Sequence, residues 1–371
     1  MNRSAHVHGP DRVDMLMEQA LAEGVFPGAD VLCAAAGEVV LHRTYGLARQ
    51  LGGGELLTAE ARFDLASVSK ALGTSVAAMF AWEAELLGLA EPLDTSLPLP
   101  APLGRLTPWH LLSHCSGLPA WLPLHERADA AGMLSAPLDQ RRAWMRRQVA
   151  DTPLEYTPGS RSVYSDLGFM VLEWLLETRT GERLDGYLRQ RFHEPLGLER
   201  TGYVLHEAAT KAAGPFVATE RCPWRARVLQ GEVHDHLTWV MGGVCGQAGL
   251  FSTAWEIHRM LADLWQSWQG DGGTLASETV RRFWQPARVP GSCFRLGWDG
   301  PSLTGYSSAG RLMDRAAVGH LGFTGCSIWL DPRAGYWLVL LTNRIHPRSD
   351  NRRLAGFRPA FHDLLVRELR L

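Results

Sequence analysis

The chain has 371 residues, of which 46% are hydrophobic and 20% charged, a balance typical of a globular protein with a large buried core. Its formal net charge is −2 and it carries no long basic stripe, which argues against a nucleic-acid partner. The short run Arg141, Arg142, Arg146 and Arg147 is predicted to form an exposed helix face.

The sequence contains no apolar segment that would direct it to a membrane. The N-terminal stretch lacks the apolar core of a signal peptide, and no later stretch approaches about eighteen apolar residues. We therefore expect a cytoplasmic protein without a membrane partner. The six cysteines are far apart and include no Cys-x-x-Cys pair, so they are expected to be reduced thiols in a core.

The first third of the chain predicts a helix, two strands and a second helix. Residues 13–21 have helical apolar spacing, and residues 28–48 form two apolar stretches around Gly37 that are typical of a hairpin. The sequence FDLASVSK at 63–70 then precedes an apolar run whose spacing suits a buried helix. Ser67 is predicted to lie at the N-terminus of that helix.

The middle of the chain is predicted to be mostly helical, and its end to return to strands. A proline-rich passage at 93–108 precedes helical segments near 109–112, 139–150, 166–179 and 184–192. Residues 326–330 and 336–342 are predicted strands, joined by a turn at 331–335. The last segment, from Leu354 to Leu369, has one apolar stripe and is predicted to be an amphipathic helix packed on the sheet.

This order of elements predicts an α/β fold of the α+β kind, with an antiparallel β-sheet built from both chain ends. N- and C-terminal helices would flank the sheet, and a helical subdomain would be inserted between its halves. We expect one catalytic domain over 1–371, with a sheet subdomain of 1–85 and 240–371 and a mostly helical subdomain of 86–239. The catalytic cleft is expected where the two parts meet.

Lysine is rare in this chain, and one lysine is placed beside a serine. Only Lys70 and Lys211 occur among 37 basic residues, and Lys70 follows Ser67 by three positions. A guanidinium stays protonated, whereas a buried ammonium can lose its proton and act as a base. Residues three apart share a helix face, so the Lys70 amine can reach the Ser67 hydroxyl at the favourable helix N-terminus. The pair predicts an activated serine nucleophile.

Two further tripeptides fit an acyl-transfer site. Tyr-Ser-Asp at 164–166 lies between a Thr-Pro-Gly-Ser turn and an apolar helix, a position that places Tyr164 at the mouth of a cleft. Taken alone, such a tyrosine is also typical of a structural residue. His-Leu-Gly at 320–322 opens the C-terminal hairpin, where Gly322 lets the backbone approach a ligand closely.

With these motifs the chain resembles the serine β-lactamase and penicillin-binding-protein-like hydrolases, especially the branch of class C β-lactamases, DD-peptidases and family VIII esterases. FDLASVSK is similar to the nucleophile motif, Tyr-Ser-Asp to the Tyr-x-Asn element, and His-Leu-Gly to the Lys-Thr-Gly or His-x-Gly position. The stretches LTPWHLLSHCSGLPAW, EPLGLERTGY, GQAGLFSTA and LLTNRIHP also match in order, so the resemblance covers nearly the whole chain.

The resemblance implies that Ser67 attacks an acyl carbonyl, that Lys70 and Tyr164 share the proton transfers, and that water releases the acyl-enzyme. It places the oxyanion on the backbone amides of Ser67 and Phe323, with His320 and Gly322 beside the substrate. Whether Lys70 or Tyr164 is the general base stays open. No metal or organic cofactor is implied.

Asp166 and Leu321 depart from the family pattern. Leu321 offers no hydroxyl where relatives have threonine to bind a carboxylate, and an ionised Asp166 only accepts hydrogen bonds where asparagine also donates. Asp166 is expected either to hold Lys70 charged or to be protonated through burial. We therefore predict a carboxylesterase acting on a small ester or amide. The alternatives are a β-lactamase or D-aminoacyl peptidase, and a non-enzymatic acyl sensor or scaffold. Oligomeric state is not predicted.

Several weaker signals are interpreted as structural. His110 and His114 lie four apart without a third ligand, so a metal site is not predicted. The cluster His-Asp-His at 234–236 is expected to form hydrogen bonds, and the glycines at 242–249 lack the order of a nucleotide-binding loop. Trp121 and Trp239 are candidates for the wall of an acyl pocket.

Overall fold

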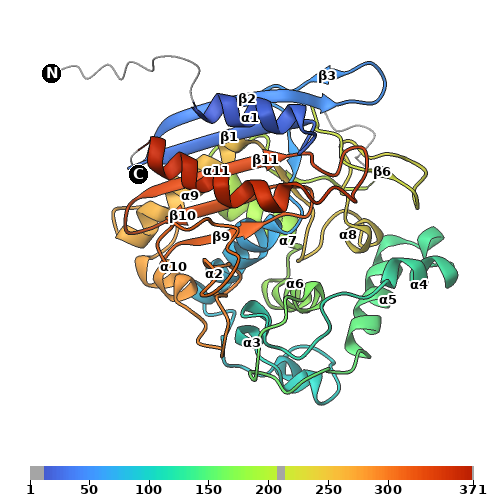
Figure 1. Ribbon diagram of the computed structural model, residues 1–371. Coiled ribbons are helices and arrows are strands. Elements are labelled where there is room, and N and C mark those ends of the chain that lie inside the picture. The colour runs from blue at the N-terminus through green and yellow to red at the C-terminus, as the bar shows by residue number, and fades with distance from the viewer. Residues whose placement is uncertain (1–11, 207–213, 370–371) are drawn as a thin grey trace.

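The computed structural model describes residues 12–206 and 214–369, so Lys211 lies outside the described residues. A six-stranded antiparallel sheet in the order β3-β2-β1-β11-β10-β9 forms the centre of the fold (Figure 1). The strands come from both ends of the chain, which confirms the predicted sheet. They are β1 (Gly28–Ala35), β2 (Glu38–Arg49), β3 (Glu55–Leu56), β9 (Val318–Leu321), β10 (Ser327–Asp331) and β11 (Tyr336–Thr342).

The two central strands are buried over almost their whole length. Leu32 of β1 lies opposite Val339 of β11, so the first and last long strands are neighbours. β1 and β2 form the predicted hairpin, and its turn uses Ala36 and Gly37, which have φ of 50° and 87°. Two consecutive positive φ values match the right-handed twist of paired strands, which explains the tight connection.

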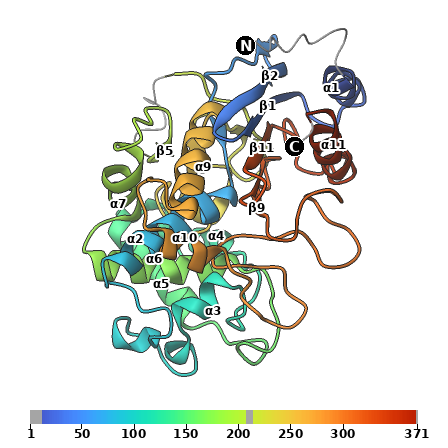
Figure 2. The same cartoon turned by 90° about the vertical axis from the view of Figure 1, so that its left-hand side faces the viewer.

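Helices from the two ends cover the outer face of the sheet. α1 (Arg12–Ala22) and α11 (Leu354–Glu368) lie side by side on that face, as Figure 2 shows. Met17 of α1 and Phe361 of α11 belong to one hydrophobic cluster with Leu338 of β11. Both terminal helices were predicted, and their packing on the sheet is confirmed.

The inner face is covered by α9 (Ala254–Gln269), and a large core continues from it into the helical part of the chain. The predicted helices of the middle are present. α4, α8, α9 and α10 went unpredicted: α4 and α8 are short, whereas the apolar residues of α9 recur at helical spacing and were a usable signal. The helical elements are α2 (Val76–Glu83), α3 (Pro108–Leu112), α4 (Leu124–Ala130), α5 (Leu138–Ala150), α6 (Asp166–Thr180), α7 (Leu184–Leu188), α8 (His236–Val240), α10 (Ser277–Trp284) and the short turns η1 (Lys70–Ser75), η2 (Leu93–Thr95), η3 (Leu103–Arg105), η4 (Met133–Ser135) and η5 (Arg189–His193).

Two small sheets complete the structure. β4 (Phe63–Asp64), β8 (Leu250–Ser252) and β5 (Gly202–Tyr203) form one, and β6 (Arg221–Cys222) pairs with β7 (Arg227–Val228) in the other. In the part of the chain that the structure describes, no helix combines the length and apolar character needed to cross a membrane. All six cysteines are free, and five are buried as predicted, whereas Cys293 is partly exposed.

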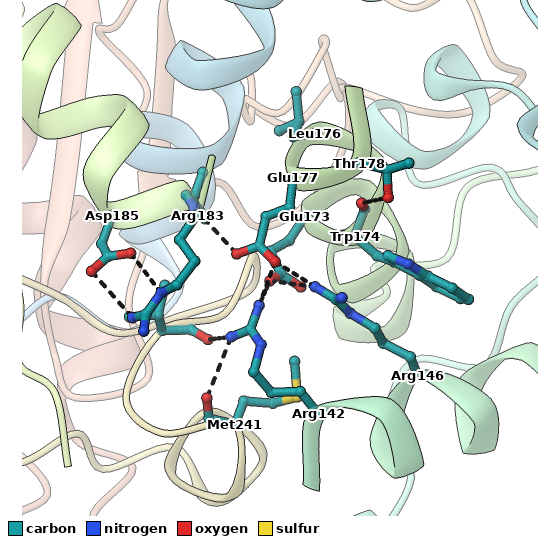
Figure 3. Close-up of polar contacts among 12 residues, drawn as sticks. Arg142, Arg146, Glu173, Trp174, Leu176, Glu177, Thr178, Arg183, Asp185 and Met241 are labelled. Carbon is teal, nitrogen blue, oxygen red and sulfur yellow. Dashed lines mark hydrogen bonds and ion pairs between the residues drawn. The ribbon is translucent and has the colours of Figure 1, made fainter. Parts of the chain in front are cut away.

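Arg141 is buried rather than exposed, and the predicted exposed face is also wrong at Arg142 and Arg146. Both side chains extend from α5 to α6, where they form ion pairs with Glu173 and Glu177 (Figure 3). Arg146 Nη2 lies 2.5 Å from Glu177 Oε2, and Glu173 is fully buried. Their carboxylate partners lie about thirty positions later in the chain, too far for local charge spacing to reveal them.

Candidate active site

The sequence-predicted site residues meet in one cleft of about 690 Å³, beside the β9 edge of the sheet. Lys70 lies fully buried behind Ser67. The remaining predicted residues line the cleft: Ser67, Tyr164, Asp166, His320, Gly322 and Phe323. Other lining residues include Trp121, Asp235, Phe294, Leu321, Arg344 and Arg358.

Ser67 lies immediately before a buried helix, at the predicted N-terminal position. β4 ends at Asp64, and the chain then turns through Ala66, which has φ of 46°. The helix begins just after Ser67, passes through the π-helical turn η1 and continues as α2. Every residue of η1 is buried, so the turn that carries Ser67 is anchored in the core. Wide π-turns inside helices often occur at functional sites.

The Lys70 ammonium is fully buried and has three acceptors for its three protons. They are Ser67 Oγ at 3.0 Å, Asp166 Oδ1 at 2.6 Å and the carbonyl of Gln247 at 2.9 Å. Burial alone would lower the pKa of Lys70, but Asp166 and then Tyr164 raise it above its usual value. For Asp166 the effects have the opposite signs: burial raises the pKa of the carboxyl group, and the charge of Lys70 partly lowers it. Asp166 therefore contacts Lys70 directly, and both expected arrangements, the charged pair and the pair with its proton on Asp166, use this same hydrogen bond.

Tyr164 lies over the lysine with its hydroxyl buried. Lys70 Nζ is 4.8 Å from the centre of the Tyr164 ring, and the phenol oxygen has no hydrogen-bond partner among the described residues. Burial raises the pKa of Tyr164 to about 12, although Lys70 partly opposes the shift. The phenol is therefore neutral at ordinary pH and is a proton donor to whatever occupies the cleft.

His114 supports Tyr164, a role that sequence reasoning missed. Its ring lies 4.6 Å from that of Tyr164 and 5.1 Å from that of Phe169. Nδ1 accepts the backbone N–H of Ser165 at 3.1 Å, so the ring proton is on Nε2, and burial lowers the pKa of His114 well below its usual value. His114 lies in the stretch LTPWHLLSHCSGLPAW, which is similar to the family, and this similarity could have pointed to it. His110 instead caps α3 through Thr107, and among the described residues no group of three His, Cys, Asp or Glu side chains could hold a metal ion.

The turn after β9 places Phe323 in the same cleft as Ser67. Gly322 N–H donates to the carbonyl of Cys326 at 2.8 Å and closes the turn. A Cβ atom at Gly322 would lie 2.4 Å from the carbonyl oxygen of Leu65, so only glycine fits this approach. His320 Nδ1–H donates to the carbonyl of Leu321 at 2.8 Å, and burial lowers the pKa of His320 to about 3. His320 is thus neutral.

The glycine-rich loop at 241–249 forms the support beneath Lys70. Thr74 Oγ1 donates to the carbonyl of Gly246 at 2.7 Å, and a Cβ atom at Gly246 would lie 2.0 Å from the carbonyl oxygen of Phe169. Arg142 Nη1 donates to the carbonyl of Val244 at 3.2 Å, so the buried ion-pair cluster also holds this loop. The loop therefore contacts α5, α6 and η1, close to where the carbonyl of Gln247 accepts a hydrogen bond from Lys70.

The structure also shows where the cluster at 234–236 and the tryptophans Trp121 and Trp239 lie relative to the cleft. Asp235 accepts the Thr238 N–H at 2.7 Å and caps α8, the hydrogen-bonding role expected for the cluster. Trp121 lines the cleft and is half-exposed. Trp239 is not among the lining residues and packs against Trp224 with ring centres 5.3 Å apart.

The antiparallel sheet with paired terminal helices, together with a helical part beside its inner face, defines the β-lactamase and transpeptidase class of fold. The family model for beta-lactamase matches residues 13–359. The chain therefore belongs to the β-lactamase family and is a serine hydrolase.

Curated relatives and a solved structure agree with this assignment. An N-acetylmuramyl-L-alanine amidase of Bacillus subtilis (strain 168) is 30% identical over 90% of this chain and 81% of its own length. A putative D-alanyl-D-alanine carboxypeptidase of Salmonella typhi is also 30% identical, over 90% and 82%. The octameric penicillin-binding protein homologue from Pyrococcus abyssi superposes with a TM-score of 0.73 at 20% identity, covering 96% of this chain and 76% of that one.

Proposed function

We propose that Ser67 is the nucleophile of an esterase that works through an acyl-enzyme. The observation that carries this proposal is the chain of hydrogen bonds from Ser67 Oγ to Lys70 Nζ to Asp166 Oδ1, at 3.0 and 2.6 Å. A serine hydroxyl is a weak nucleophile until a neighbouring base accepts its proton. The buried amine is the group within reach of that proton.

The pair of Lys70 and Asp166 provides the base without a change in net charge. Transfer of one proton from the Lys70 ammonium to Asp166 leaves a neutral amine facing Ser67 and a carboxylic acid behind it. Burial favours this neutral form over the separated charges. The amine then accepts the Ser67 proton while Ser67 Oγ forms the bond to the acyl carbon.

The remaining steps use Tyr164 and two backbone amides. The amides of Ser67 and Phe323 hold the oxyanion, and the Tyr164 phenol gives its proton to the leaving alcohol as the ester bond breaks. Lys70 returns a proton to Tyr164, which restores the phenol. Water then attacks the acyl-enzyme by the reverse transfers, releasing the carboxylic acid and Ser67.

Replacement of Asp166 by asparagine should move the pH profile of kcat/KM toward acid. Asp166 raises the pKa of Lys70, so its removal leaves a buried amine whose pKa falls. Because the free amine is the base, the acidic limb of the profile moves to lower pH. Profiles of D166N and wild type with one p-nitrophenyl ester test this. An unchanged acidic limb would show that Asp166 does not control the base.

The preference for esters rests on the cleft wall. Leu321, Phe323, Trp121 and Phe294 present apolar surface, and Asp166 is engaged by Lys70 and so offers no donor to a substrate amide. We expect the purified protein to hydrolyse p-nitrophenyl butyrate with a higher kcat/KM than nitrocefin or a D-alanyl dipeptide. Titration of the reactive serine with a fluorophosphonate gives the concentration of active enzyme, so that the three values of kcat/KM can be compared per active site. Faster turnover of either amide substrate would overturn the ester assignment.

A second candidate, an amidase or peptidase acting on a carboxylate-bearing substrate, is favoured by two arginines. Arg344 and Arg358 line the cleft, and neither forms an ion pair with a described residue. A substrate carboxylate would supply the missing anion. The names of the 30% identical relatives agree with this candidate. Turnover of an N-acyl-D-alanyl-D-alanine that is lost when its carboxylate is methylated would favour it over the esterase.

A further inference from the structure

The two amides proposed for the oxyanion hole come from segments far apart in the chain. Ser67 follows β4 in the small sheet, and Phe323 follows β9 at the edge of the large sheet. Two donors stabilise one oxyanion only when both point to the same position, with a tolerance of about half an ångström. A physical link between the two segments is therefore needed.

The carboxylate of Asp64 fixes the first segment. Asp64 is almost completely buried, and its Oδ1 accepts the N–H of Ala66 at 2.8 Å. This bond spans the turn that ends in Ser67 and holds Ala66 at φ of 46°, a conformation that alanine rarely adopts. Oδ2 accepts the N–H of His234 at 2.6 Å. The carboxylate thus connects the Ser67 turn to His234, which also lines the cleft.

The main chain at 64–65 fixes the second segment. The carbonyl of Asp64 accepts the hydroxyl of Thr324 at 2.7 Å, one residue after Phe323. The carbonyl of Leu65 lies directly against Gly322, which is why that position has no room for a Cβ atom. One dipeptide therefore contacts the residues on both sides of Phe323.

The Phe323 side chain is held by the same network. Its ring stacks on His234 with centres 5.5 Å apart and planes at 21°, and His234 donates its N–H to Asp64. The Arg344 guanidinium lies 4.8 Å from the ring centre, and its Nη2 donates to the Phe323 carbonyl at 2.6 Å. The orientation of the Phe323 peptide is thus tied to Asp64 through both its ring and its neighbour Thr324.

An isolated buried carboxylate is costly, and Asp64 has no ion-pair partner among the described residues. We propose that Asp64 is a positioning residue that holds the Ser67 and Phe323 amides in alignment for the oxyanion. This inference rests on the proposed acyl transfer at Ser67. A side chain with two acceptor oxygens satisfies both backbone N–H groups at once, which an amide with a single acceptor oxygen does not do.

The main test is Asp64→Asn, compared with Asp263→Asn as a matched control. Asp263 is also a buried carboxylate with two hydrogen bonds, both from Thr274, and it does not line the cleft. We expect D64N to lower kcat by about 30- to 100-fold with KM within about threefold, because the alignment matters in the transition state. D263N should lower Tm and leave kcat within about twofold.

A boronic acid provides a readout that a purely structural role does not move. Phenylboronic acid forms a tetrahedral adduct with a serine hydroxyl, and one boron-bound oxygen occupies the oxyanion position. We expect D64N to weaken its inhibition constant by about the same factor as kcat, and D263N to leave it unchanged. Thr324→Val, which removes the hydroxyl bonds to the Asp64 carbonyl and to Cys326 Sγ, should lower kcat by about 5- to 10-fold, and it tests the alignment independently if D64N does not fold.

The outcomes separate this inference from the proposed function. If the wild type reacts with a fluorophosphonate but D64N and T324V keep wild-type kcat and boronate affinity, the positioning role is wrong and Ser67 chemistry stands. Equal losses in D64N and D263N also overturn the positioning role, because they would track stability alone. If the wild type is not labelled at Ser67, the acyl-transfer proposal itself fails. The inference is supported only by losses in D64N and T324V that D263N does not share.

Discussion

Ser67→Ala is expected to lower kcat for p-nitrophenyl butyrate by about 10⁴-fold or more. Without the hydroxyl no acyl-enzyme forms, and the cleft retains only binding and backbone donors. The variant should fold normally, since among the described residues Ser67 Oγ makes one hydrogen bond, to Lys70. Steady-state rates and covalent labelling by a fluorophosphonate, followed by intact mass, measure the effect.

Ser69→Ala is the matched control for this experiment. Ser69 lies two residues away in the same motif, and its Oγ accepts the Leu250 N–H at 3.0 Å rather than facing Lys70. We expect S69A to keep fluorophosphonate labelling and most of its turnover. Labelling that persists in S67A, or disappears in S69A alone, would show that another serine is the nucleophile. Labelling of the wild type without turnover would instead favour an acyl sensor.

Lys70→Met is expected to lower kcat by about 10³-fold or more, because it removes the amine that hydrogen-bonds Ser67 while keeping a side chain of similar length. It should also destabilise the protein by about 2–3 kcal/mol, since Asp166 is then a largely buried carboxylate without its cation. Steady-state kinetics and thermal unfolding measure the two effects separately.

The double variant K70M/D166N distinguishes catalysis from stability in this pair. Asparagine removes the unpaired charge, so the double variant should recover much of the stability that K70M loses, with a higher Tm. Its kcat should remain as low as that of K70M, because no base has been restored. Recovery of activity in K70M/D166N would show that Tyr164, rather than Lys70, accepts the Ser67 proton.

The sequence predicts best those features that are local. Ser67 and Lys70 are three positions apart, and a helix alone brings their side chains close enough for the 3.0 Å contact in the structure. Tyr164 and His320 were found through short motifs of a known family. The long strands and terminal helices followed from apolar periodicity, because each buries one face against the core.

What the sequence did not reveal depends on contacts between distant segments. The arginines of α5 were predicted to be exposed because their partners, Glu173 and Glu177, belong to another helix. Asp64 carries no motif of its own, and its importance comes from bonds to Ala66, His234 and Thr324 in three different segments. Such acceptor networks have no period or spacing in the chain, so only a three-dimensional structure identifies them.

The pairing of β1 with β11 has a consequence for biosynthesis. Leu32 of β1 pairs with Val339 of β11, which is synthesised about 300 residues later. β9, which precedes the Phe323 turn, pairs with β10, and β10 pairs with β11. Most of the chain must therefore leave the ribosome before the central sheet closes, and contacts of such long range form late in folding. The helix that begins after Ser67 and contains Lys70 can form early, whereas the Phe323 amide proposed for the oxyanion hole joins the sheet at the end. A partly synthesised chain thus contains the proposed nucleophile before the second proposed oxyanion donor is in place, so it is not expected to be active.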